Sequence, residues 1–316
     1  RGGSPKLISA LRPRVEKLFK WFERYQNDLG LLEKVPSWVF VEWSKANDFV
    51  QDVNYPSNML FAGALDAAAE LYGNQVWKRQ ADKLRDVINE LSFDGTWYVD
   101  NAIRKPNGSL EVTRNRSETC QYYAFFFNIA TPKSRPELWR TLTSEFGPKR
   151  DVKKIQPEIH ISNAFIGNYL RIEVLSRAGM ITQILNESAA YFGYMAERKG
   201  TLWEFSDACA SCNHGFASHV AVMMLRDVVG IAKVDHVQSV YTTIGGGSAG
   251  GDPFMGSANA ETRKATLTIL LAERGDRPRK QGIENQIRAS LETLPGVRSK
   301  VGLGGSGEKY VLVLTG

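Results

Sequence analysis

Three segments of the sequence place aromatic side chains beside carboxylic acids. They are residues 38–43 (Trp-Val-Phe-Val-Glu-Trp), 93–100 (Phe-Asp-Gly-Thr-Trp-Tyr-Val-Asp) and 202–205 (Leu-Trp-Glu-Phe). Aromatic rings stack on the apolar faces of sugars and carboxylates bind their hydroxyl groups, so this combination predicts a carbohydrate site. The candidate sugar-binding residues in these segments are Glu42, Trp43, Trp97 and Trp203. The alternative is that the Trp rings close the ends of helices, because burial is the usual fate of aromatic side chains.

A second pattern of reactive residues is Cys209-Ala-Ser-Cys212, followed closely by His214. These side chains could bind zinc, but a structural zinc site needs four ligands and no fourth is apparent. A redox Cys-x-x-Cys would follow a strand, and none is predicted at this place. We therefore expect a tight turn of small residues, with neither a metal ion nor a cofactor. Residues 246–250 fit Gly-x-Ser-x-Gly, but they lie between two predicted strands and not between a strand and a helix, as a nucleophile elbow does. No Gly-x-x-x-x-Gly-Lys-Ser/Thr motif occurs, and no Gly-x-Gly-x-x-Gly lies between a predicted strand and a predicted helix.

The composition changes near residue 236. All seven Trp lie before this point, and so do all Tyr and Phe except Tyr241, Phe254 and Tyr310. The rest of the chain holds half of the 28 glycines. A chain of 316 residues is long enough for two domains, and a single domain rarely divides its aromatic core so unequally. The sequence therefore predicts one domain over residues 1–236 and a smaller one over residues 237–316.

The larger part has the apolar period of helices and little strand signal. Pro56 marks the start of one helix and Gly73 its end, as expected for these residues at helix termini. Short connections between successive helices favour antiparallel pairs, and the prediction is a mainly α fold. The predicted helices cover residues 11–22, 60–71, 75–92, 117–129, 162–178, 181–192 and 213–226, with a further short one starting at Pro136.

The smaller part alternates like strands around one amphipathic helix. Its glycine-rich turns and the order of its elements predict a small α+β unit of ferredoxin-like type that lacks its opening strand and helix. The predicted strands are residues 237–244, 263–273, 297–302 and 309–314, and the helix covers residues 283–294.

Several motifs of the larger part resemble bacterial α-L-rhamnosidases. Residues 193–204 (Gly-Tyr-Met-Ala-Glu-Arg-Lys-Gly-Thr-Leu-Trp-Glu) resemble the segment that carries the catalytic base of that family. Residues 211–217 (Ser-Cys-Asn-His-Gly-Phe-Ala) resemble its Ser-x-Asn-His motif, and residues 162–170 an earlier helix start. Glu42-Trp43 sits where the family often has an acidic residue before Trp. The order and spacing fit across roughly residues 7–236.

The resemblance implies an (α/α)6 toroid of six helical hairpins and a rhamnoside substrate. It also implies inverting hydrolysis of a terminal α-L-rhamnosyl bond, in which one carboxylate deprotonates water and a carboxylic acid protonates the leaving oxygen. Glu204 matches the general base. His214 matches a residue near the base and the sugar hydroxyls, and Asn213 beside it is a further sugar-binding candidate.

The chain departs from the family in two respects. His214 follows only ten positions after Glu204, whereas many relatives have a longer loop, and this alters one wall of the pocket. The family's general acid lies in an Arg-Asp-Glu-Arg-type stretch followed by Trp, and no such stretch occurs. We therefore expect an incomplete toroid without its general acid. It would hydrolyse rhamnosides poorly, or bind sugars without turnover.

The smaller part resembles the periplasmic porter region of resistance–nodulation–division (RND) efflux pumps. Residues 237–245 are similar to a Val-x-Ser-Val-Phe strand, residues 274–278 (Arg-Gly-Asp-Arg-Pro) to a charged turn, and residues 294–297 (Leu-Pro-Gly-Val) to the turn after the helix. The resemblance implies that this part would pack against other pump subdomains in its parent. The alternative is a generic ferredoxin-like unit. Since the join at residues 230–236 has no linker composition, a chimeric chain is the favoured explanation.

Charge and hydropathy exclude other classes of partner. The net charge of +6 is modest and the cations are scattered, so no nucleic-acid partner is predicted. No run of 18 or more apolar residues occurs, so the sequence predicts no membrane span. Both resemblances favour a periplasmic or secreted location for the parent proteins.

Overall fold

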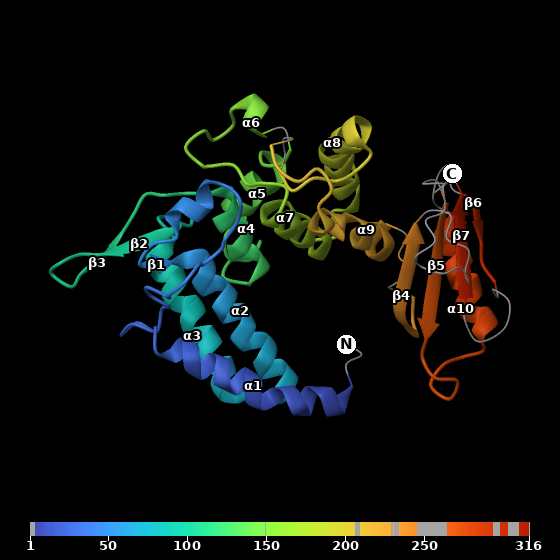
Figure 1. Ribbon diagram of the computed structural model, residues 1–316, viewed down its shortest axis with the longest axis horizontal. Coiled ribbons are helices and arrows are strands. Elements are labelled where there is room, and N and C mark those ends of the chain that lie inside the picture. The colour runs from blue at the N-terminus through green and yellow to red at the C-terminus, as the bar shows by residue number, and fades with distance from the viewer. Residues whose placement is uncertain are drawn as a thin grey trace. The chain divides into compact units, whose positions relative to one another are not determined.

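A computed structural model shows a chain that divides into two compact units, one ending at Val220 and the other beginning at Ala221. The first unit is mainly helical, and the second is a sheet with one helix (Figure 1). This confirms the predicted mainly α fold followed by a small α+β part. The predicted domain boundary at residue 236 lies further along the chain and stays a prediction. The structure describes residues 4–148, 150–205, 209–228, 230, 234–244, 264–292, 298–302 and 310–315.

Most predicted helices are present, with their ends shifted by a few residues. No helix among the described residues is both long enough and apolar enough to cross a bilayer. The helices up to residue 228 are α1 (Pro5–Glu23), α2 (Tyr55–Tyr72), α3 (Gln75–Ser92), α4 (Glu118–Phe126), α5 (Pro136–Ser144), α6 (Arg150–Lys153), α7 (Ile166–Arg177), α8 (Ile181–Lys199) and α9 (His219–Met223), with 3-10 turns at Lys45–Phe49 (η1) and Gly215–Ser218 (η2) and a π-helical turn at Met224–Val228 (η3).

Side-chain caps explain where the central helices begin. Asn54 accepts a hydrogen bond from the backbone N–H of Ser57 at 2.9 Å and starts α2. Ser117 accepts from the N–H of Cys120 at 3.0 Å and starts α4. Gly73 ends α2 in the left-handed conformation (φ +65°), which a residue without a Cβ adopts at no steric cost.

The helices of the first unit form hairpins. In the α2–α3 hairpin, Arg85 of α3 pairs with Asp66 of α2 at 2.9 Å. In the α7–α8 hairpin, Arg171 pairs with Glu187 at 2.6 Å. Helices α2 and α4 also approach closely, since a Cβ added at Gly63 would lie 2.1 Å from the Phe127 ring.

A small sheet beside these helices was not predicted from the sequence. Strands β1 (Val53–Asn54), β2 (Asn101–Arg104) and β3 (Leu110–Val112) pair antiparallel in that order, with Val53 opposite Ala102 and Ala102 opposite Val112. Strands this short carry too few side chains to show a two-residue period. The sheet fixes the chain immediately before α2 and before α4.

The second unit matches the predicted strand and helix order. Strands β4 (Val237–Ile244), β5 (Lys264–Leu271), β7 (Tyr310–Thr315) and β6 (Arg298–Lys300) pair antiparallel in this spatial order, and α10 (Lys280–Glu292) is the helix (Figure 1). The predicted turn at residues 294–297 lies outside the described residues. Among the described residues, Leu267, Ile269, Ile283, Ile287 and Leu291 form a hydrophobic core between the sheet and α10.

Candidate active site

The loop that carries Glu204 is closed by backbone hydrogen bonds. The N–H of His214 donates to the carbonyl of Leu202 at 2.9 Å, and the N–H of Glu204 donates to the carbonyl of Ser211 at 2.9 Å. The two arms of the loop therefore lie side by side. This pairing places Glu204 and His214, which are ten positions apart in the sequence, on one short loop.

The Glu204 carboxylate is half-buried and makes no hydrogen bond or ion pair with any described residue. Its backbone carbonyl accepts from the side-chain amide of Asn163 at 3.4 Å. The backbone is thus attached to the segment before α7, and the carboxylate stays available to a ligand. A catalytic base needs this combination of a fixed position and an unoccupied oxygen.

Aromatic rings from four separate segments meet beside this loop. We call them the aromatic rim. Trp43 and Phe205 stack with ring centroids 6.4 Å apart, and Phe165 lies 4.3 Å from Phe216 and 5.0 Å from the His214 ring. Phe40 connects the two groups, at 4.9 Å from Trp43 and 6.0 Å from Phe165. The rim consists of Trp38, Phe40, Trp43, Phe165, Phe205 and Phe216.

Glu42 lies beneath the rim and is fully buried. Its carboxylate accepts hydrogen bonds from the Thr119 hydroxyl at the start of α4 and from the Gly167 N–H at the start of α7. Ser44 donates a third bond at 2.9 Å. Burial raises the pKa of Glu42 to about 7, although these donors act in the opposite direction. The carboxylate thus holds the rim segment to two helix starts.

Asp100 has a similar position between α2 and α4. Its carboxylate accepts from the Ser117 N–H at 2.6 Å and the Ser117 hydroxyl at 2.7 Å, and its backbone carbonyl accepts from the N–H of Tyr55 at 2.8 Å. Burial raises the pKa of Asp100 to about 7 as well. Helices α2, α4 and α7 therefore begin at the same end of the unit, where their N-terminal N–H groups favour hydroxyl or anionic ligands.

The predicted site residues have different surroundings. The structure brings Glu204, Trp43 and His214 together at the rim, and Asn213 is exposed on the same loop. Trp97 is buried and stacks on Phe146 at 5.7 Å, away from the rim contacts. The roles assigned to all of these residues stay predictions.

Trp203 and Glu42 are also buried. Trp203 is only 1% exposed and packs edge-on against Tyr194. Direct contact of either side chain with a sugar requires a change in this geometry. The sequence patterns do not single out Asp100, Asn163 or Gly167, although all three lie in the stretches named for the predicted site, residues 93–100 and 162–170.

The cysteines do not form part of a metal centre in the described part of the chain, where no three His, Cys, Asp or Glu side chains come close enough to hold an ion. Cys209 is exposed and Cys212 is partly buried. The hydroxyl of Thr201 donates to the carbonyl of Cys212 and fixes the turn.

Comparison of the sequence with protein-family models and with curated proteins gives no match. The structure is similar to a GH78 family rhamnosidase of Bacillus sp. GL1, with a TM-score of 0.58 and 18% identity over 84% of this chain and 27% of that one. It is also similar to a rhamnosidase from Klebsiella oxytoca with rhamnose bound, with a TM-score of 0.50 and 16% identity over 69% of this chain and 41% of that one. This chain therefore spans less than half of either enzyme.

At these identities the likeness shows the fold. The chain has a rhamnosidase-like, glycoside-hydrolase-like helical fold, which confirms the first resemblance at that level. Neither structure supports the resemblance to an efflux pump or the hypothesis of a chimeric chain.

Proposed function

We propose that the larger domain, over residues 1–236, is a glycoside hydrolase-like domain for terminal α-L-rhamnosides. Glu204 acts as the general base of an inverting reaction. The observation that carries the proposal is the half-buried carboxylate of Glu204, which bonds to no described residue, on the loop that holds His214 and next to Phe205 of the aromatic rim. The bound sugar would lie with its apolar face against Trp43, which is 37% exposed.

In this mechanism Glu204 removes a proton from a water molecule that attacks the anomeric carbon. His214 binds a sugar hydroxyl next to the base, and Asn213 supplies a further polar contact. A second carboxylic acid must protonate the leaving oxygen from the other side of the sugar. Glu42 and Asp100 are buried and bonded within the protein, so neither can supply that proton in this geometry. Lack of acid assistance slows hydrolysis by roughly 10²–10⁴-fold.

An activated aryl α-L-rhamnoside tests the proposal, because its leaving group needs little protonation. Glu204→Gln should abolish release of the aryl group and leave folding intact, and added azide should restore part of it with an inverted product. Glu197→Gln is the matched control, since Glu197 is exposed on α8 seven positions earlier. Unchanged hydrolysis by Glu204→Gln would refute the assignment of the base.

A sugar-binding module without turnover is the second candidate. The hydrogen bonds of Glu42 and Asp100 within the protein favour this candidate. Because of these bonds, neither residue can serve as the general acid opposite Glu204. Titration calorimetry with L-rhamnose separates the two candidates. Binding that is lost in Trp43→Ala, with no hydrolysis of the aryl rhamnoside, would establish the module.

The smaller domain, over residues 237–316, adds no function to this proposal. Its resemblance to the porter region of efflux pumps would require that the exposed side of its sheet or helix bind other pump subdomains. Expression of the chain with and without residues 237–316 tests whether this part affects sugar binding. We expect no effect.

A further inference from the structure

A polar cavity lies between α4, α7 and α8 of the first unit, and neither Glu204 nor Trp43 lines it. Its volume is about 160 Å³. The lining residues used below are Glu118, Tyr122, Ser162, Asn163, Asn168 and Arg171.

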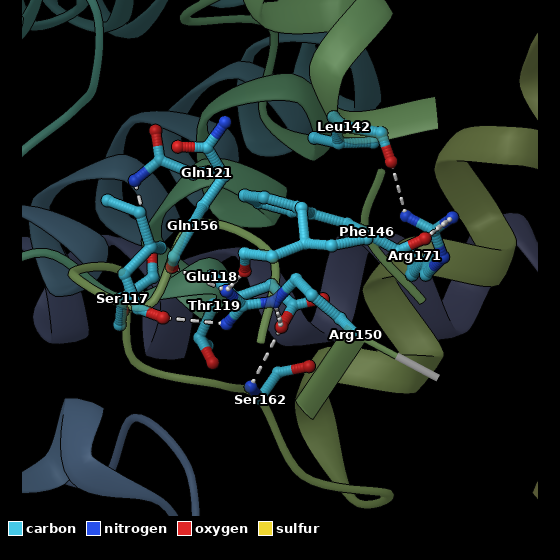
Figure 2. Close-up of polar contacts among 12 residues, drawn as sticks. Ser117, Glu118, Thr119, Gln121, Leu142, Phe146, Arg150, Gln156, Ser162 and Arg171 are labelled. Atoms are coloured by element: carbon cyan, nitrogen blue, oxygen red, sulfur yellow. Dashed lines mark hydrogen bonds and ion pairs between the residues drawn. The ribbon is translucent and has the colours of Figure 1, made fainter. Parts of the chain in front are cut away.

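The charged groups around this cavity are fully engaged with one another. The Glu118 carboxylate accepts from Arg150 at 3.1 Å and from the N–H of Ser162 at 3.2 Å (Figure 2). It also accepts from the Tyr122 hydroxyl. Arg171 donates to Glu187 at 2.6 and 2.7 Å, and also to the Tyr122 hydroxyl and two backbone carbonyls. All five N–H donors of Arg171 are used in this way, and each oxygen of the Glu118 carboxylate accepts at least one hydrogen bond from a described residue.

Asn168 differs from its neighbours because its side-chain amide is buried and unsatisfied. The residue is 6% exposed, and its Nδ2 has no hydrogen-bond partner among the described residues. A buried amide donor without an acceptor is costly, so it indicates a partner that fills the cavity. The hydroxyl of Ser162, across the cavity lining, also makes no hydrogen bond with a described residue.

We propose that this cavity binds one neutral sugar ring, held by hydrogen bonds with the Asn168 amide and the Ser162 hydroxyl. The free groups are neutral, which matches sugar hydroxyls and excludes charged ligands as the preferred class. Tyr122 and Tyr191 supply aromatic surface for the apolar face of the ring. A cavity of about 150 Å³ takes a six-membered ring such as benzene, so the volume admits at most one sugar ring and not a longer chain.

The proposal does not rest on hydrolysis at Glu204. The two sites are nevertheless connected through Asn163, which lines the cavity and donates to the backbone carbonyl of Glu204. The segment from Ser162 to Asn168 thus has the sugar cavity on one side and the Glu42 carboxylate at Gly167 on the other. Occupancy of the cavity would stabilise this segment in the position that the candidate active site requires.

The test follows the Asn168 side-chain amide signals by NMR in the ¹⁵N-labelled full chain, with Asn168→Leu used to assign them. L-Rhamnose and D-glucose should shift these signals at millimolar concentration, whereas D-glucuronate and inorganic phosphate should not. Asn168→Leu should weaken the sugar binding measured by calorimetry about tenfold, or about 1.4 kcal/mol, which corresponds to the loss of one hydrogen bond.

Two further variants separate this site from the aromatic rim. Val152 lines the cavity but is 85% exposed, so Val152→Trp should block the mouth without unfolding the chain, and should abolish the shift. Trp43→Ala should leave the shift unchanged. Absence of any shift with either sugar would mean that the cavity holds water only, and would overturn the proposal. Persistence of the shift in Val152→Trp, or its loss in Trp43→Ala, would also overturn it, whether or not Glu204 proves catalytic.

Discussion

Two regions of the first unit contain the same pair of residues with opposite burial. In Glu42-Trp43 the carboxylate is fully buried and the ring is 37% exposed. In Trp203-Glu204 the ring is 1% exposed and the carboxylate is half-buried. The buried member of each pair holds its segment in place, and the other member is presented at the aromatic rim. A Trp beside a Glu therefore does not have one fixed role, because the packing decides which of the two can meet a ligand.

Truncation of the two Trp rings should give the largest difference in stability between the two regions. Trp203→Ala is expected to lower the free energy of unfolding by about 4 kcal/mol, because it leaves a large cavity in the core. Trp43→Ala should cost about 1 kcal/mol or less and should instead remove sugar binding at the aromatic rim. Urea unfolding of the variants measures both. Trp203→Phe is the control, since it keeps a ring and removes an indole N–H that makes no hydrogen bond with a described residue. Equal costs at positions 203 and 43 would contradict the comparison.

Removal of the Glu42 and Glu204 carboxylates should give the next largest difference in stability. Glu42→Ala is expected to cost about 3 kcal/mol at neutral pH, because the Thr119 hydroxyl and the Gly167 N–H lose their acceptor inside the protein. Glu204→Ala should change the free energy of unfolding by less than about 0.5 kcal/mol. Thermal or urea unfolding checks both. A large cost at Glu204 would indicate that its carboxylate is structural.

The pH dependence of stability sharpens the role of Glu42. Its pKa rises from 4.5 to about 7 on folding, so the folded protein binds this proton more tightly than the unfolded chain. The stabilisation is complete below about pH 4.5 and is lost as the pH rises through about 7. The difference in unfolding free energy between the natural protein and Glu42→Gln should shrink by roughly 3 kcal/mol over this range. Parallel curves for the two proteins would show that Glu42 does not titrate in this way.

Substitution of Gly167 tests the close contact between Gly167 and the Glu42 carboxylate, and its expected effect on stability is the smallest of the four. A Cβ at this position would lie 2.3 Å from the Ser162 Cβ and 2.7 Å from the Glu42 Oε1, so Gly167→Ala should cost about 2 kcal/mol. Gly193→Ala on α8, where a Cβ meets no atom within 4 Å, should instead be neutral or stabilising by up to about 1 kcal/mol. Denaturant midpoints of the two variants give the comparison. A Gly167→Ala protein as stable as the Gly193→Ala protein would refute the close contact.

The helices and the strands of the second unit could be predicted because their signals are local. Pro56 and Gly73 bound α2, and alternating residues identify β4 over the predicted range. The burial of Glu42 could not be predicted in this way. Its bonds reach Thr119 and Gly167, which are 77 and 125 positions away, and no periodicity links such distant residues. For the same reason the sequence predicts Trp97 and Trp203 as sugar contacts, although both rings are buried in the structure.

The bonds of Glu42 also have a consequence for the order of folding. The α2–α3 hairpin is closed by contacts between neighbouring parts of the sequence, such as Arg85 with Asp66, and can form early. The Glu42 carboxylate can accept its hydrogen bonds only after α4 and α7 have both folded, because Thr119 and Gly167 lie at the starts of these two helices. During synthesis, the ribosome must therefore release residue 167 before residues 41–44 can settle. We expect the aromatic rim to be the last part of the first unit to become ordered and the first to lose its order under mild denaturation.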